Sequence, residues 1–368
     1  MNIQSVYSEN SNIDEVIGEI KRQLQDFDTR LLIYFASSNY DPVQISKAIG
    51  DSFSTAQTFG CTTAGEITSG KMLKNSLVAM AFNAEAIGDM KIEVIENVKA
   101  NCDIKPAFGS FEQHFNTSMA ELDFSQYVGI ILVDGLSGCE EKIMDRIGDK
   151  TNIIFIGGSA GDDLKFTQTH VFANGKTYTD AAILAVIKPA AGFDIIKTQS
   201  FNALNKQLVA TKVNAEAREI IEFNNLPAVQ AYSEALGINK EEADNYFMSN
   251  PVGLIYGDEI FVRSPQRLDG TNMIFYCNIL EGMDVSLLES TDIVSDTKQA
   301  VADKVKELGK ISGLIDFHCI LRTLELEQKG QTIDYGKIFK DIPTVGFSTY
   351  GEEYVGHINQ TSTILVFK

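Results

Sequence analysis

Apolar and polar positions follow one order along the chain, and that order occurs three times. A continuous apolar run, "LLIYFAS" at 31–37, comes first, and such a run is typical of a strand buried on both faces. A helical pattern follows from Asp41, which is placed to cap a helix that has Pro42 in its first turn. A second strand is predicted at "TAQTFG", which ends at Gly60. The pattern therefore predicts strand, helix, strand.

The same order returns at "YVGIILVDG" and again at "LIDFHCILRTLELE", each of which we interpret as a strand followed by a helical stretch. From the first strand to the glycine that ends the second, the distances are 29, 30 and 31 residues in the segments 31–60, 127–157 and 315–346. About thirty residues is the size of a unit in which a helix joins two parallel strands. The chain therefore contains three copies of one unit.

Each copy continues into a glycine-rich corner, a polar hairpin and a further apolar strand, "SLVAMAF", "AAILAVI" or "STILVFK". In the second copy the hairpin signal Asn174-Gly175 lies before that strand. The predicted fold is α/β, with two packed modules built from repeated strand-helix-strand-hairpin units and mixed sheets flanked by helices.

The length of 368 residues exceeds one ordinary hydrophobic core and favours two modules. The segment "NNLPA", at 224–228, interrupts the pattern. We therefore predict one module at 1–225 with two units and another at 226–368 with the closing unit. Between the second and third units the sequence predicts further strands, and helices near "LPAVQAYSEALG" and from about 291 to 308.

Composition limits the classes of partner. The formal charge of -19 repels phosphate backbones and anionic membrane surfaces, so we expect neither nucleic acid nor membrane as a partner. No apolar run approaches the roughly 20 residues of a membrane span, and the start lacks the pattern of a signal peptide, so we expect a cytoplasmic protein. The five cysteines include no C-x-x-C pair, which favours reduced thiols over disulfides or a zinc site.

The three corners are the strongest candidates for chemistry: GCTTAGE at 60–66, GGSAGD at 157–162 and GFSTYGE at 346–352. Glycines permit close approach of backbone to a ligand, and the hydroxyls donate and accept hydrogen bonds. Corner N–H groups can bind a carboxylate or carbonyl, while the acidic residue suits an amine or braces the loop. The alternative is ordinary turn chemistry, in which the carboxylate accepts from backbone N–H groups.

An enzyme interpretation rests on "GGSAG" at 157–161, which matches the G-x-S-x-G pattern of a serine hydrolase with Ser159 as nucleophile. That pattern requires a helix directly after the serine and a histidine base, yet "DDLKFTQTHVF" reads as extended. We therefore keep the hydrolase as an alternative and expect no catalytic residue.

Two histidines are candidate metal or haem ligands. In "IDFHCIL" the alternation of a strand places Asp316, His318, Ile320 and Arg322 on one face. His357 follows the third corner in "VGHINQT". Neutral imidazole is a common haem-iron ligand, although a hydrogen-bonded structural histidine is the alternative for each.

The strings "GCTTAGEI", "NPVGLIYGDEIFVRSP" and "VGFSTYGEEYVGHINQTSTILVF" resemble the FIST family of bacterial sensory proteins, over nearly the whole chain. The resemblance implies a signal-transduction protein that binds a small ligand between an N-terminal and a C-terminal FIST module, such as an amino acid or a related carboxylate. One branch of the family consists of stand-alone haemoproteins that sense nitric oxide and act on a histidine kinase or a cyclic-di-GMP enzyme. This chain is similar to that branch, which makes haem a possible cofactor and such an enzyme the expected partner.

The resemblance also indicates which residues contact the ligand. Arg263, in "FVRSP", is a cation that can pair with a ligand carboxylate, although a surface ion pair is an equal alternative. Asn359 either contacts the ligand or braces the third corner. The full set of predicted ligand contacts is Thr62, Thr63, Gly65, Glu66, Ser159, Arg263, Ser348, Thr349, Tyr350, Gly351, Glu352 and Asn359.

Overall fold

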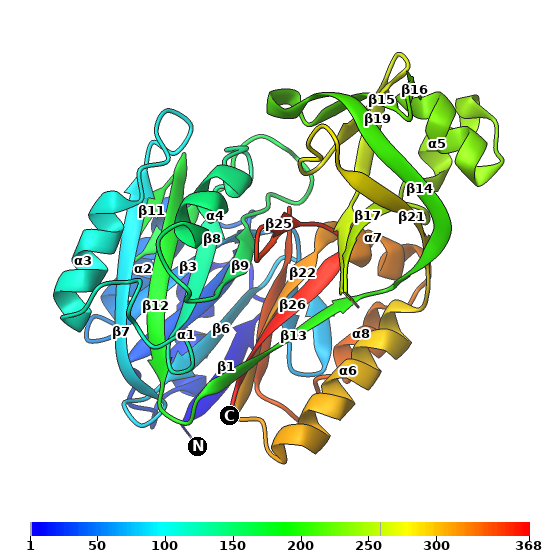
Figure 1. Ribbon diagram of the computed structural model, residues 1–368. Helices are drawn as coiled ribbons and strands as arrows, with labels where there is room; N and C mark the ends of the chain where they lie inside the picture. Colours follow the sequence, from blue (N-terminus) through cyan, green and yellow to red (C-terminus); the bar gives the residue numbers. More distant parts are fainter. Residues whose placement is uncertain (1, 258) are drawn as a thin grey trace. The chain divides into compact units, whose positions relative to one another are not determined.

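The computed structural model describes residues 2–257 and 259–368 and divides the chain into two compact units (Figure 1). Unit 1 comprises Met1–Lys197, Lys298–His357 and Ser362–Lys368, and unit 2 comprises Thr198–Thr297 and Ile358–Thr361. The three strand-helix-strand segments, 31–60, 127–157 and 315–346, therefore lie in unit 1. These two units, defined by packing, differ from the predicted sequence modules 1–225 and 226–368. The boundary between those modules stays a prediction.

Unit 1 contains three sheets, each with six strands, and each repeat supplies the centre of one sheet. The first has the order β1 (Ile3–Ser8), β6 (Leu77–Phe82), β2 (Leu31–Ser37), β3 (Gln57–Thr63), β10 (Val171–Ala173), β11 (Lys176–Tyr178). The second has the order β25 (His357–Ile358), β24 (Glu352–Tyr354), β9 (Phe155–Ser159), β8 (Val128–Val133), β12 (Ala181–Pro189), β7 (Ile87–Glu96). The third has the order β13 (Phe193–Gln199), β26 (Thr361–Phe367), β22 (Gly313–Cys319), β23 (Thr344–Thr349), β4 (Glu66–Thr68), β5 (Lys71–Leu73).

The central strand pairs β2·β3, β8·β9 and β22·β23 are parallel, as the repeat predicts. Helices connect them and flank the sheets. The helices of unit 1 are α1 (Ile13–Gln23), α2 (Pro42–Ser52), α3 (Lys105–Phe115), α4 (Glu140–Gly148), α7 (Ile320–Gln328) and α8 (Thr332–Lys337), with α6 (Ile293–Leu308) entering from unit 2. The predicted cap of α2 is confirmed, since the Asp41 side chain accepts from the Gln44 N–H and Pro42 is the first helical residue. The predicted α/β class and the mixed, helix-flanked sheets are likewise confirmed.

The hairpin that leaves each corner joins the sheet of another repeat. Strand β4 of the first repeat pairs with β23 of the third, β24 of the third pairs with β9 of the second, and β10 of the second pairs with β3 of the first. In Figure 1 the light-blue hairpin of the first repeat accordingly lies beside the orange and red strands of the third. The three repeats are thus joined in a closed cycle.

Apolar side chains from all three sheets form one shared core. Alternate residues of the central strands face it, such as Phe35, Ile130 and Phe317, and each is at most 1% exposed. The opposite faces are covered by helices: α1 and α2 pack on the first sheet, and α3 and α4 on the second. Burial on both faces explains why the central strands have continuous apolar sequences.

One element differs from the prediction. The run "LIDFHCILRTLELE" is a strand only as far as Cys319, and α7 begins at Ile320. The alternation that placed Ile320 and Arg322 on the same strand face as His318 was therefore wrong for those two residues. Asp316 and His318 do share a face of β22, where both are completely buried.

Unit 2 contains an antiparallel sheet. It has its own hydrophobic core, which includes Phe223, Tyr232 and Phe275. The Asn224-Asn225 turn, at the predicted module boundary, connects two of its strands. Its elements are β14 (Phe201–Asn214), β15 (Glu219–Phe223), β16 (Leu226–Pro227), α5 (Ala228–Leu236), β17 (Val252–Tyr256), β18 (Glu259–Arg263), β19 (Pro265–Asp269), β20 (Asn272–Phe275) and β21 (Asp284–Ser290), with short 3-10 helices at Ala215–Ala217 and Lys240–Tyr246.

Candidate functional site

The three corners meet in unit 1 and are tied to one another by backbone hydrogen bonds. Between the first and third corners, the Ser348 N–H donates to the Gly65 carbonyl (2.8 Å). Between the first and second, the Gly161 N–H donates to the Thr62 carbonyl (2.9 Å). Between the second and third corners, the Ser159 N–H donates to the Gly351 carbonyl (2.9 Å). We call this closed set of contacts the corner ring.

The first glycine of every corner is explained by strand packing. A Cβ on Gly60 would lie 1.7 Å from the carbonyl oxygen of Tyr34, and one on Gly157 would lie 1.7 Å from that of Ile131. A Cβ on Gly346 would lie 2.3 Å from the Asp316 carbonyl oxygen. Only glycine permits this approach between neighbouring strands. These three glycines serve the fold and need no ligand to explain them.

The corner carboxylates brace their own loops. Glu66 accepts from the Thr63 hydroxyl, from the Ser76 N–H (3.1 Å) and from the Ser76 hydroxyl (2.6 Å). Glu352 accepts from the Thr349 hydroxyl (3.0 Å), so the i,i+3 contact is the same in both corners. Burial raises the pKa of Glu66 to about 7, against the hydrogen bonds from Ser76 and Thr63 that lower it.

The second corner is braced from the third. The Asp162 carboxylate accepts from the N–H groups of Phe166 (2.9 Å) and Thr167 (2.7 Å) and from the Tyr350 hydroxyl. Burial raises the pKa of Asp162, but these hydrogen bonds outweigh it and hold the pKa below its usual value. The Tyr350 ring also stacks on Phe166, with centroids 5.1 Å apart. Tyr350 therefore fixes the loop that leaves the second corner.

The corner residues predicted to contact a ligand are brought together but lie inside the protein. Thr63, Ser348 and Thr349 are each at most 1% exposed. The Ser348 hydroxyl is hydrogen-bonded to Thr323 on α7 (2.7 Å). A ligand reaches these groups only if a corner opens, so direct ligand contact stays a prediction.

Ser159 does not have the surroundings of a hydrolase nucleophile. It is completely buried, and its hydroxyl donates to the Glu140 carboxylate (3.2 Å). No helix follows it, because the chain continues as a loop to β10. The geometry therefore opposes the hydrolase alternative.

The two candidate haem ligands differ in their protonation. The His357 Nδ1 lies 3.0 Å from a Glu353 carboxylate oxygen, and both side chains are at most 3% exposed. Although burial lowers it, the Glu353 carboxylate raises the pKa of His357 to about 9. A protonated imidazole has no lone pair for a metal, so His357 does not fit an iron ligand at neutral pH.

His318 has the donor chemistry of an iron ligand. The Tyr335 hydroxyl donates to Asp316 (2.9 Å) and lies 2.9 Å from the His318 Nδ1, which assigns the proton to Nδ1. Burial and then the charge of Arg322 hold the pKa of His318 well below its usual value, so the ring is neutral. No described residue donates a hydrogen bond to its Nε2 lone pair. The Tyr335–Asp316 contact resembles the outer-shell support of a metal-binding histidine, although packing encloses the ring completely.

Two predicted contacts lie in unit 2. The Arg263 guanidinium donates to the carbonyls of Asn278 (3.0 Å) and Val262 (3.2 Å), so backbone groups hold it. Asn359 is 1% exposed, and its side-chain oxygen has no hydrogen-bond partner within 2–257 or 259–368. The corner ring in unit 1 therefore includes neither Arg263 nor Asn359.

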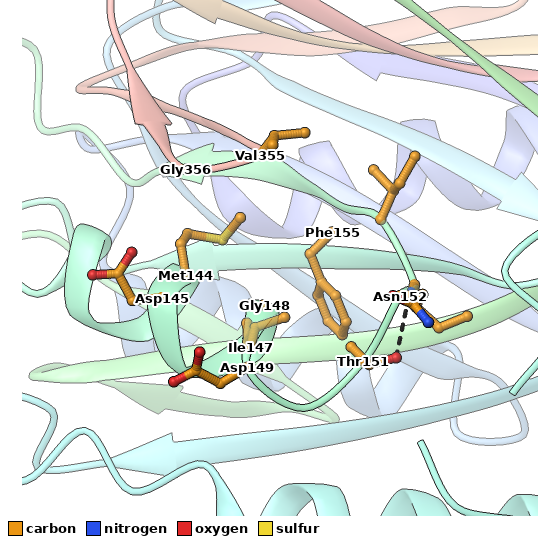
Figure 2. Close-up of a pocket in the computed structure, with 12 residues that line it drawn as sticks. Met144, Asp145, Ile147, Gly148, Asp149, Thr151, Asn152, Phe155, Val355 and Gly356 are labelled. Carbon is orange, nitrogen blue, oxygen red and sulfur yellow. Dashed lines mark hydrogen bonds between the residues drawn. The ribbon is translucent and has the colours of Figure 1, made fainter. Parts of the chain in front are cut away.

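A cavity of about 620 Å³ lies beside the hairpin of the third corner (Figure 2). Its volume is within the usual range for small-molecule sites. Figure 2 shows the carboxylates of Asp145 and Asp149 at one end, Asn152 at the other, and Met144 and Phe155 between them. The cavity is lined by Met144, Asp145, Ile147, Gly148, Asp149, Thr151, Asn152, Ile153, Ile154, Phe155, Val355 and Gly356.

Val355 is held in a conformation that disfavours its side chain. The equivalent turn of the second repeat is Asn174-Gly175, where Asn174 has φ 47°. In the third repeat the turn is Val355-Gly356, and Val355 has φ 50° while 68% exposed at the cavity wall. A β-branched residue rarely adopts positive φ, and such strain is concentrated at functional sites.

We expect Val355→Asn to stabilise the protein by about 1 kcal/mol, because asparagine tolerates the left-handed region. Urea unfolding at pH 7 measures the change. Val43→Asn is the control, since Val43 is similarly exposed (61%) but helical and should give no gain. An unchanged or lower stability of Val355→Asn would remove the case for strain at this turn.

The comparisons with known proteins place the chain in a family. The FIST N domain matches residues 30–226 and the FIST C domain matches residues 228–354. The chain belongs to the FIST family. FIST domains are sensory domains of signal transduction, so the predicted family and sensor class are confirmed.

A further similarity is to Uncharacterized protein MJ1623 of Methanocaldococcus jannaschii, with 23% identity over 265 residues. The match covers 67% of this chain and 51% of that relative, so this chain spans about half the relative's length.

Two features of unit 1 were not found from the sequence. Tyr335, on α8, was read only as part of a helical stretch, and its contact with His318 depends on tertiary packing. The acidic residues of α4 are spaced by four in the sequence, but nothing in the sequence indicated a cavity beside them.

Within the described ranges 2–257 and 259–368, no cluster of three or more His, Cys, Asp or Glu can hold a metal ion. No helix among the same residues has the length and apolarity to cross a membrane. Cys61, Cys102, Cys139, Cys277 and Cys319 are buried free thiols.

Proposed function

We propose that this FIST protein binds a small ligand in the cavity beside the third corner and regulates a separate signalling partner, such as a histidine kinase or a cyclic-di-GMP enzyme. The observation that carries the proposal is the position of Val355 and Gly356. Both residues line the cavity, and they form the turn of the hairpin that leaves the corner ring. A ligand there contacts the hairpin that joins the third repeat to the second.

The corner ring supplies a relay. A ligand shifts an equilibrium only through different contacts with two arrangements of the protein. A bound molecule contacts the Val355-Gly356 turn directly, and the two preceding strand residues pair with β9. Strand β9 ends at Ser159, which is bonded to the third corner. Movement of the turn therefore changes contacts in two corners together.

A thermal-shift screen with amino acids, amines and small carboxylates tests the proposal. A ligand present at 100 times its Kd stabilises the folded protein by about 2.7 kcal/mol. Gly148→Phe fills the cavity, because a Cβ at Gly148 meets nothing within 4 Å and Gly148 lines the wall. Gly109→Phe is the matched control, on another helix and equally open. Loss of the shift in Gly148→Phe alone supports the site; no shift with any compound contradicts it.

A second candidate is haem-based sensing of nitric oxide, favoured by the lone pair of His318 Nε2. Bound haem would supply an iron that takes up nitric oxide, and His318 would hold it with Tyr335 and Asp316 fixing the ring. We expect hemin titration to give a Soret band that His318→Ala abolishes and His357→Ala retains. A band unchanged in His318→Ala, or no band in the parent protein, would remove this candidate.

A further inference from the structure

Three acidic residues form a column on one face of α4. Glu141, Asp145 and Asp149 are spaced by four, so their side chains lie one above another along the helix. Like charges at this spacing destabilise a helix by a few tenths of a kcal/mol per pair. Asp149 is also the C-cap residue, where the helix dipole disfavours a negative charge. The column is therefore electrostatically unfavourable in the protein alone.

Glu141, at one end of the column, lies near a cation, whereas Asp145 and Asp149 are not ion-paired among the described residues. Glu141 raises the pKa of His357, so this imidazolium faces it. Asp145 and Asp149 form no ion pair with any described residue of 2–257 or 259–368. The neighbouring cations Arg146 and Lys150 border another hollow, which shares only Asp149 with this cavity. Burial, then Glu141 and Asp149, raises the pKa of Asp145, as expected for a carboxylate without a counter-charge.

Much of the remaining cavity wall is apolar, and Thr151 and Asn152 are its polar side chains. Met144 and Phe155 are at most 7% exposed and close one side. Val355 contributes an exposed apolar side chain in the position where the sister repeat has asparagine. The strained valine makes the wall more apolar at the cost of backbone energy. The site thus combines a carboxylate pair at one end with an apolar surface.

We infer that the cavity takes an organic cation with an apolar body, namely a primary amine on an aryl or branched alkyl group. This inference rests on the proposed function and names its ligand class. The ammonium lies between Asp145 and Asp149, where it neutralises both carboxylates and the negative end of α4. The apolar body packs on Met144, Phe155 and Val355. Met144, Phe155 and Val355 offer no oxygen ligands, so this part of the wall suits an apolar body better than the water shell of a divalent cation.

Isothermal titration with 2-phenylethylamine, 2-phenylethanol and 3-phenylpropionate tests the ligand class. These probes share the aryl body and differ in charge. We expect the amine to bind at least tenfold more tightly than the alcohol and the carboxylate not to bind. The affinity for the amine falls as salt is raised from 20 to 300 mM, since exposed charges are screened.

The variant Asp145→Asn/Asp149→Asn is expected to lose at least tenfold in amine affinity and to lose the salt dependence. Asp26→Asn/Asp28→Asn makes the same change of net charge at exposed positions and should bind like the parent protein. Gly148→Phe should abolish binding of the amine.

Equal affinity for amine and carboxylate, or full amine affinity in Asp145→Asn/Asp149→Asn, overturns the inference. If the alcohol or the carboxylate binds and Gly148→Phe abolishes this, the proposed function stands and only the ligand class falls. If no probe or screened compound binds in the cavity, the proposed function itself fails.

Discussion

Replacing Gly157 by alanine is expected to destabilise the protein by about 3 kcal/mol or more. The added Cβ would lie 1.7 Å from the Ile131 carbonyl oxygen and 2.7 Å from its carbon. These are backbone atoms of the paired strand β8, so no side chain can move aside. Relief requires separation of β8 and β9. Urea unfolding followed by circular dichroism measures the change.

Gly18→Ala is the matched control for this substitution. Gly18 lies within α1, and a Cβ there meets nothing within 4 Å. Alanine is a better helix former than glycine, so Gly18→Ala should stabilise by about 0.5 to 1 kcal/mol. Equal effects of the two substitutions would contradict the close approach of β8 and β9. We expect Gly60→Ala to behave like Gly157→Ala, since both glycines have the same role in their repeats.

The second large effect is a fall in stability with rising pH that depends on Glu66. Its pKa is raised by burial to about 7 in the folded protein, from an ordinary value of 4.5 in the unfolded chain. A raised pKa stabilises the fold fully below about pH 4.5, and this contribution is lost as the pH rises through about 7. A shift of this size corresponds to about 3 kcal/mol. We expect Glu66→Gln to remove that part of the slope.

The measurement is the free energy of unfolding in urea between pH 4.5 and 8.5, for the parent protein and Glu66→Gln. The amide can still accept from Ser76 and donate to the Thr63 hydroxyl, so the variant keeps the brace. Glu85→Gln, at an exposed position, should leave the pH dependence unchanged. A parallel pH dependence of parent and Glu66→Gln would show that Glu66 titrates normally in the fold.

The repeat could be predicted because local patterns encode it. Continuous apolar runs, a capped helix start and glycines at fixed distances all lie within about thirty residues of one another. The exchange of hairpins could not be predicted. Strands β4, β10 and β24 have three residues each, and their partners lie in other repeats. Nothing in three residues specifies which sheet they join.

Helix α7 shows why one element was misread. Its buried residues are Ile320, Arg322, Thr323, Glu325 and Leu326, while Leu321 and Leu324 are half-buried. A helix whose buried face mixes polar and apolar residues lacks the usual apolar stripe, so the start of its sequence read as an extension of the strand. The buried polar residues lie beside the third corner, where Thr323 bonds to Ser348. Prediction from hydrophobic patterns fails where polar residues are buried for a functional or structural reason.

The candidate site was predicted in part. The sequence indicated three equivalent corners, and the structure joins them in one ring. The cavity beside them was not predicted, because its wall combines α4 with a turn some two hundred residues away. The internal repeat still held one clue. A valine stands in the third hairpin turn where the second has asparagine.

Hydrogen exchange tests most directly the claim that a ligand in the cavity acts on the corner ring. The comparison is the parent protein with and without the tightest-binding compound of the screen, with Gly148→Phe as control. We predict slower exchange at the cavity wall, 144–155, at the hairpin, 352–358, and also at the two remote corners, 60–66 and 157–162. Protection confined to 144–155 and 355–356, with both remote corners unchanged, would contradict the relay.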